Sequence, residues 1–174
     1  MSPMLTKIFV NNGFGHLRYN LKINSVITWE AFLQSQFNKV QEVRFRQLTG
    51  TGPRFRVVQK DSIQLFFGLL YMYEYEETSG QVEIVYNRDH RLSNYLSLGF
   101  QPTAYLSINH ISYFQPNLRD FNNDFRISSE TTLDVQLSAK LSLRTYFQLV
   151  YDEKPPIGVP RTMYSLTNGL SWRF

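Results

Sequence analysis

The C-terminal stretch of the chain, residues 164–174, reads YSLTNGLSWRF and decides the fold class. Alternate positions from Tyr164 through Trp172 to Phe174 are mostly large and apolar, whereas the intervening positions are small or polar. A period of two is the pattern of a β-strand with one apolar face, because successive side chains of a strand point to opposite sides. The stretch therefore predicts a strand that ends on an aromatic residue.

The same alternation recurs toward the N-terminus and predicts about ten strands. These are residues 2–11, 14–23, 25–37, 41–58, 62–77, 88–101, 103–115, 122–137, 140–152 and 162–174. The connections alternate between tight turns and the longer loops 77–88, 115–122 and 152–162, with the short 37–41 as an exception on the long side. An even strand number, short turns at one end and long loops at the other are typical of outer-membrane barrels.

Composition excludes several other classes. The chain has 174 residues, which suits one domain over 1–174, and it has no Cys and three His, so we expect neither a metal site nor another cofactor. No apolar run approaches the ~20 residues of a membrane-spanning helix. The Arg residues alternate with apolar residues and form no basic block, so nucleic acid is not an expected partner. No secretory signal is visible in Met1–Val10.

Alternation alone leaves two barrels open, because the apolar face could line the lumen of a soluble barrel or face lipid. Long strands, aromatic residues at the strand ends and charge on the small-residue face favour lipid. We therefore predict an all-β, antiparallel, up-and-down transmembrane β-barrel, monomeric, in the outer membrane of a Gram-negative cell. Expected partners are membrane lipid and, through the strand ending at Phe174, the barrel-assembly machinery. The membrane-facing aromatic residues are Tyr71, Tyr73, Phe147, Tyr164, Trp172 and Phe174.

The polar face carries charges of both signs, which we expect to pair inside the lumen. The predicted lumen network comprises Glu42, Arg44, Arg46, Arg54, Arg56, Glu74, Glu76, Arg126, Glu130, Asp134 and Arg144. A ten-stranded barrel is only somewhat wider than the eight-stranded type, whose interior side chains fill it. Paired charges would therefore plug the lumen, and a narrow polar conduit is the alternative.

One pair of residues could carry catalysis. His110 and Ser112 share a strand face, and their spacing resembles the His-x-Ser pair of outer-membrane lipid A deacylases. In those enzymes Asn follows the serine and a glutamate orients the histidine, whereas Tyr113 and Phe114 follow here. We therefore expect His110 and Ser112 to be interface residues and the protein not to be an enzyme.

Several runs together resemble the outer-membrane family catalogued as domain of unknown function 481, whose members include salt-induced outer membrane proteins. They are NGFGHLRYN at 12–20, WEAF at 29–32, QFNK at 36–39, LTGTG at 48–52, YMYEYE at 71–76 and NRDHR at 87–91. The resemblance implies a monomeric barrel without an established activity and offers no catalytic residue. It also implies further strands before 16–20, about twelve in a full-length protein.

The function expected from these observations is a structural or interaction role in envelope integrity or in the response to osmotic stress. Loops 77–88, 115–122 and 152–162 are the expected contact surfaces. The alternatives are a narrow pore for small polar solutes and, third, a lipid A-modifying enzyme that would depend on His110 and Ser112.

Overall fold

A computed structural model describes residues 12–80 and 83–172 and contains one nine-stranded antiparallel sheet. The strands are β1 (Asn12–Lys22), β2 (Ile27–Asn38), β3 (Val43–Lys60), β4 (Ile63–Ser79), β5 (Ile84–Thr103), β6 (Leu106–Pro116), β7 (Phe125–Gln136), β8 (Leu141–Asp152) and β9 (Thr162–Trp172). Each strand pairs with the next along the chain, so the up-and-down prediction is confirmed. The predicted strand 2–11 and Phe174 lie outside the described residues.

The predicted loop 77–88 is mostly strand. The β4–β5 ladder continues from Glu76, opposite Asn87, to Ser79, opposite Ile84. The connection is therefore only residues 80–83, and the NRDHR run at 87–91 belongs to β5. Sequence analysis missed this because Ser79 and Gly80, between the two alternating runs, are common turn formers.

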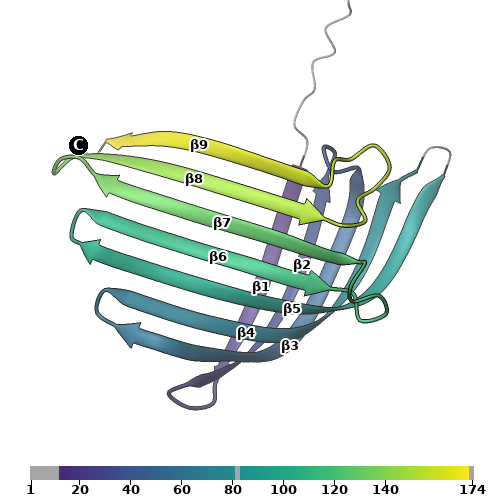
Figure 1. Cartoon of the computed structure of the whole chain (residues 1–174), viewed down its shortest axis with the longest axis horizontal. Helices are drawn as coiled ribbons and strands as arrows, with labels where there is room; N and C mark the ends of the chain where they lie inside the picture. Colours follow the sequence, from purple (N-terminus) through teal and green to yellow (C-terminus); the bar gives the residue numbers. More distant parts are fainter. Residues whose placement is uncertain (1–11, 81–82, 173–174) are drawn as a thin grey trace, which may run out of the picture.

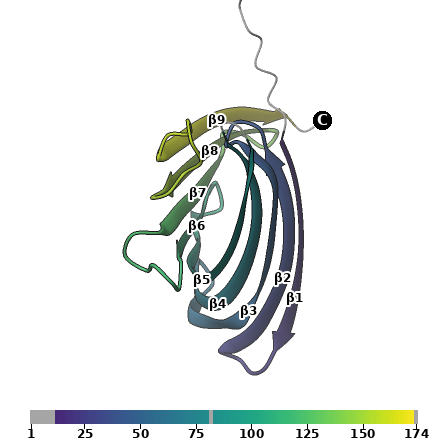
Figure 2. The ribbon, with the colours of Figure 1, turned by 90° about the vertical axis from the view of Figure 1, so that its right-hand side faces the viewer.

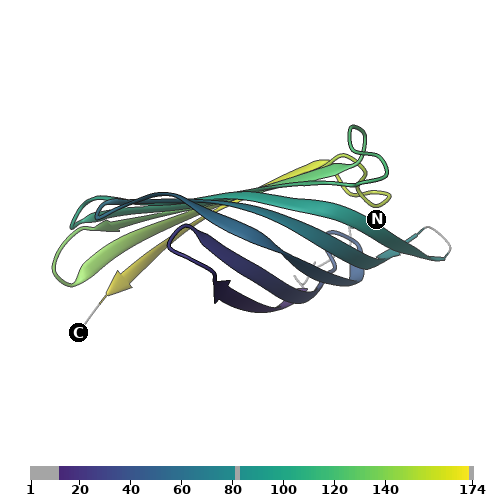
Figure 3. The same ribbon diagram turned by 90° about the horizontal axis from the view of Figure 1, so that it is seen from below.

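Figures 1 and 2 show how the sheet curves. Viewed as in Figure 2, it curls into an open C with β1 and β9 as its edges, and Figure 3 shows a single twisted layer. No ladder joins β1 to β9 among the described residues. The longer β6–β7 and β8–β9 loops lie together at the right-hand end in Figure 1.

The two faces of the sheet differ in chemistry. The concave face carries buried charged residues, among them Glu30, Glu74, Glu76 and Arg91, and a small buried cluster made of Phe32, Leu48, Leu70, Met72 and Tyr95. The convex face exposes large apolar side chains, among them Leu17, Leu69, Leu96, Phe147, Leu166, Leu170 and Trp172. Apolar residues outside and charges inside are the arrangement of a barrel that faces lipid. The described residues contain no helix long and apolar enough to cross a membrane.

Strand β3 approaches β4 very closely at Gly52. A Cβ atom at this position would lie 2.3 Å from the Leu69 carbonyl oxygen and 2.7 Å from the Leu70 Cα. Both are backbone atoms, which cannot move aside without distorting the ladder. Gly52 therefore allows the two strands to pack where the sheet curves.

We predict that Gly52→Ala destabilises the protein by about 1–3 kcal/mol, because overpacking forces backbone shifts. Gly169→Ala is the control, since a Cβ there would meet nothing within 4 Å. Urea unfolding in lipid vesicles measures both. Equal free energies of unfolding for the two variants would contradict the packing argument.

Candidate functional site

A carboxylate on β4 is the centre of the concave face. Glu74 is 1% exposed and is contacted by three arginines from three other strands. Its oxygens lie 3.1 Å from Arg46 Nε of β3 and 2.7 Å from Arg91 Nε of β5, and Arg126 of β7 donates a further hydrogen bond. These strands deliver the guanidinium groups to one point because the sheet curves around it.

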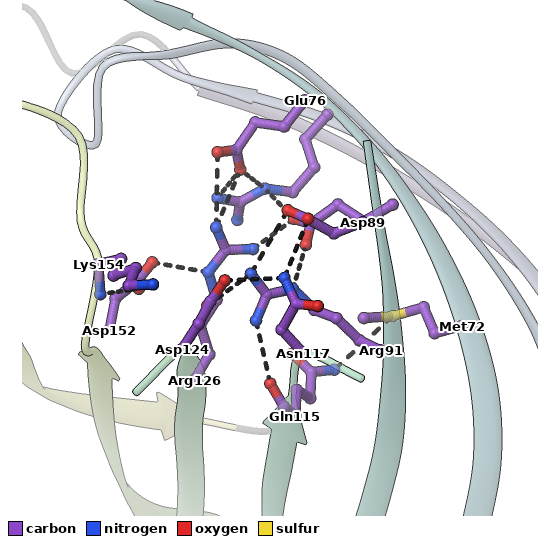
Figure 4. A network of polar contacts seen from close by, with 12 residues as sticks. Met72, Glu76, Asp89, Arg91, Gln115, Asn117, Asp124, Arg126, Asp152 and Lys154 are labelled. Atoms are coloured by element: carbon purple, nitrogen blue, oxygen red, sulfur yellow. Dashed lines mark hydrogen bonds and ion pairs between the residues drawn. The ribbon is translucent and has the colours of Figure 1, made fainter. Parts of the chain in front are cut away.

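The same arginines extend the network toward the long loops (Figure 4). Arg46 and Arg126 also contact Glu76, while Arg126 Nε lies 2.6 Å from Asp152 at the end of β8. Arg91 Nη2 lies 2.8 Å from Asp124 at the end of the β6–β7 loop. We call Arg46, Glu74, Glu76, Arg91, Asp124, Arg126 and Asp152 the upper cluster.

The loops at this end are held to the cluster and to each other. The Asn117 side-chain amide donates to Asp124 at 2.8 Å and to Asp89 at 2.9 Å, and the Leu118 N–H donates to the His90 carbonyl. Lys154 Nζ of the β8–β9 loop lies 2.6 Å from Asp120 of the β6–β7 loop. The hydrogen bond from Lys154 holds the pKa of the Asp120 carboxyl below its usual range.

A second group of charges lies lower on the concave face. Glu30 of β2 has no exposed surface, and its oxygens lie 3.1 Å from Arg54 and 3.6 Å from Arg18. The Tyr95 hydroxyl donates to the same carboxylate at 2.6 Å. Near the tight turns, Arg144 and Asp134 form a third, exposed pair at 2.6 Å.

A cavity of about 780 Å³ occupies the concave side between the first two groups. Its wall is rich in uncharged polar side chains and includes Gln34, Gln36, Gln115, Gln148 and Tyr113. Some of these side chains already bond one another; Gln34 Nε2, for example, donates to Gln36 Oε1 at 2.9 Å. Apolar side chains such as Leu70 and Met72 line the same cavity, so its wall is mixed in polarity.

The structure brings together some of the residues assigned to the lumen from sequence. Arg46, Glu74, Glu76 and Arg126 meet in the upper cluster, and Arg54 joins the second group.

Two of the assignments are wrong. Glu42 lies in the β2–β3 turn with a positive φ of 54°, and Arg44 is the exposed residue at a register shift in β3. The β-bulge breaks the alternation that placed Arg44 inside.

Two other assigned residues lack a salt bridge among the described residues. The buried Nε of Arg56 has no hydrogen-bond partner there, and Glu130 accepts a long 3.5 Å bond from Gln148.

Sequence reasoning missed three of the seven residues of the upper cluster, namely Arg91, Asp124 and Asp152. Arg91 lies within the predicted strand 88–101 and Asp124 near the start of the predicted strand 122–137, but neither was assigned to the lumen. The available signal was the spacing of Asp89 and Arg91, which puts both on one face of the predicted strand 88–101. No group of three or more His, Asp or Glu in residues 12–80 and 83–172 is arranged to hold a metal.

The residues predicted to face the membrane lie on the convex face. Tyr71, Phe147, Tyr164 and Trp172 are exposed there, and Tyr73 lies on the same side of β4 as Tyr71. His110 and Ser112 also point outward, opposite Thr131 and Ser129 of β7.

An up-and-down sheet with an apolar convex face and an ion-paired concave face defines the class of outer-membrane β-barrels. The chain belongs to the family described as protein of unknown function, DUF481, whose model matches residues 9–174. This confirms the family inferred from the sequence.

One solved structure with a similar fold is described as "NanC porin structure in rhombohedral crystal form". The superposition has a TM-score of 0.60 at 11% identity and covers 94% of this chain and 80% of that one, which shows a shared fold. A search of curated proteins found no match.

We predict that Glu74→Gln destabilises the protein strongly, by about 3–5 kcal/mol, because it leaves buried arginines without their counter-charge. Asp134→Asn is the matched control, and its exposed pair should be worth at most about 1 kcal/mol. Urea unfolding in lipid vesicles measures both. Equal losses would show that burial does not distinguish the two pairs.

Proposed function

We propose that this protein is a monomeric barrel of the outer membrane whose lumen is closed at the long-loop end, and that it serves the envelope structurally. The observation that carries the proposal is the contact of Glu74 with Arg46, Arg91 and Arg126. Glu74 and Arg91 are buried, and each of the four groups is held by charge-assisted contacts, which supports a lumen closed where they meet.

The loops support an interaction role for the same end. The β6–β7 and β8–β9 loops are fastened to the upper cluster through Asp124 and Asp152 and to each other through Lys154 and Asp120. Fastened loops present a fixed surface, which lowers the entropy that a partner must pay for on binding. We propose this surface as the site of contact with other envelope components.

We predict that the folded protein gives no single-channel steps in planar bilayers. The triple variant Arg46→Ser, Arg91→Ser, Arg126→Ser removes the guanidinium groups around Glu74 and should produce steps. Heat-modifiable gel migration reports whether the variant has folded. Reproducible single-channel steps from the unaltered protein would contradict the proposal that its lumen is closed.

A second candidate function is a narrow pore for small polar solutes. The cavity of about 780 Å³, with several glutamines in its wall, favours it, and the fold resemblance to a porin structure is compatible with it. Liposome swelling separates the two candidates, because swelling with a small sugar such as arabinose requires a continuous path. If liposomes containing the protein swell no faster than empty liposomes, the pore is excluded and the structural role is supported.

We predict that the protein reaches its folded form only with detergent or lipid, because large apolar side chains cover the convex face. The measurement is migration on gels with and without heating, after refolding in buffer or in micelles. A detergent-independent soluble monomer would contradict the proposed location.

A further inference from the structure

Four polar side chains form a cluster on the convex face, where neighbouring positions are apolar. His110 and Ser112 lie on β6, and Thr131 and Ser129 lie directly opposite on β7. Polar groups that face lipid are costly, and an ionisable one within the membrane-spanning part of a chain points to a functional site. The cross-strand row that contains His110 and Thr131 otherwise consists of Val58, Leu65, Leu98, Phe147 and Leu166.

Both ring nitrogens of His110 have hydroxyl partners. Nε2 lies 2.8 Å from Ser112 Oγ, and Nδ1 lies 2.8 Å from Thr131 Oγ1. When Nδ1 carries the proton and donates to Thr131, Nε2 accepts the Ser112 hydroxyl proton. This is the relation of a nucleophile to its general base, with the base oriented by a third group.

A further hydroxyl is close to the nucleophile. Ser129 Oγ lies 3.3 Å from Ser112 Oγ. Ser129 can therefore donate a hydrogen bond to the oxygen of a carbonyl group that is attacked by Ser112. The cluster contains a nucleophile, a base, an orienting group and an oxyanion donor within two adjacent strands.

The position of the cluster relative to the membrane interface indicates the class of its substrate. Just beyond it, toward the long loops, aromatic rings pack together: Phe114 and Phe125 have centroids 5.8 Å apart, and Phe125 and Tyr151 lie 5.7 Å apart. Aromatic girdles mark the membrane interface of a barrel. Ser112 lies two residues from Phe114 on the hydrocarbon side, which is where the ester carbonyls of lipids meet their acyl chains.

We propose that Ser112 and His110 form an acyl-transfer centre for ester-linked acyl chains of the membrane lipid around the barrel. Ser112 Oγ bonds to the ester carbonyl carbon while its proton passes to His110 Nε2. The ester C–O bond breaks, and the departing lipid oxygen takes that proton. Water then bonds to the acyl carbon through its oxygen and gives a proton to Nε2. The bond between the acyl carbon and Ser112 Oγ breaks, Oγ takes that proton from Nε2, and a fatty acid is released.

The four residues of the cluster differ in whether they contact the substrate. Ser112, His110 and Ser129 touch the reacting atoms, whereas Thr131 acts through His110 and is a positioning residue. Thr131→Ser retains the hydroxyl and should retain reactivity, but Thr131→Val should lower it. A merely structural Thr131 would make the valine variant less stable without changing the reactivity of its folded fraction.

The test uses the whole chain, folded in micelles and treated with a fluorophosphonate probe that labels activated serines. We expect mass spectrometry to find the label on Ser112. Labelling should vanish in Ser112→Ala and slow by roughly 10²–10⁴-fold in His110→Asn, because the general base is lost. Ser107→Ala, on the concave face of the same strand, is the control and should label normally.

Each variant is checked for heat-modifiable migration, so that loss of labelling is compared only among folded proteins. Fatty acid released from vesicles of phosphatidylethanolamine and phosphatidylglycerol gives a second measurement, and Ser112→Ala should abolish the release. A folded, unaltered protein that leaves Ser112 unlabelled would overturn the proposal. So would equal labelling rates for the unaltered protein and His110→Asn.

Discussion

The register between neighbouring strands is the constraint on which both faces of this sheet depend. A slip of one residue in any ladder would turn an entire strand over and carry its charges to the lipid side. The observed register instead brings arginines from β3, β5 and β7 to a single carboxylate on β4. Because Glu74 and Arg91 are buried and the other two arginines are mostly covered, a slipped pairing would leave charge without compensation, so the ion pairs and the register stabilise one another.

Much of the fold could be predicted from the sequence because a strand has only two faces. Alternation located all nine described strands to within a few residues, and it placed Arg46, Glu74, Glu76 and Arg126 on a common side. Local breaks in the period limited the prediction. The register shift in β3 removed Arg44 from the interior, and a polar run concealed residues 84–87 at the start of β5.

Contacts between distant segments could not be read from alternation. The pairing of Arg91 with Asp124 joins a strand to a loop 33 residues later, and that loop has no periodic pattern. The spacing of His110 and Ser112 was visible in the sequence, but their partners on β7 depended on the register of one ladder. Which side chains of neighbouring strands come into contact is thus set by the pairing register. The sequence of one strand does not determine that register.

The number of described strands is odd, and this fixes the relative direction of the two edge strands. In an antiparallel sheet the first and ninth strands run in the same direction, so a ladder joining β1 directly to β9 would be parallel. A cylinder that is antiparallel throughout therefore requires an odd number of additional strands between these edges. Since unpaired backbone groups are not tolerated in hydrocarbon, each edge of the described sheet is a template for a strand of opposite direction.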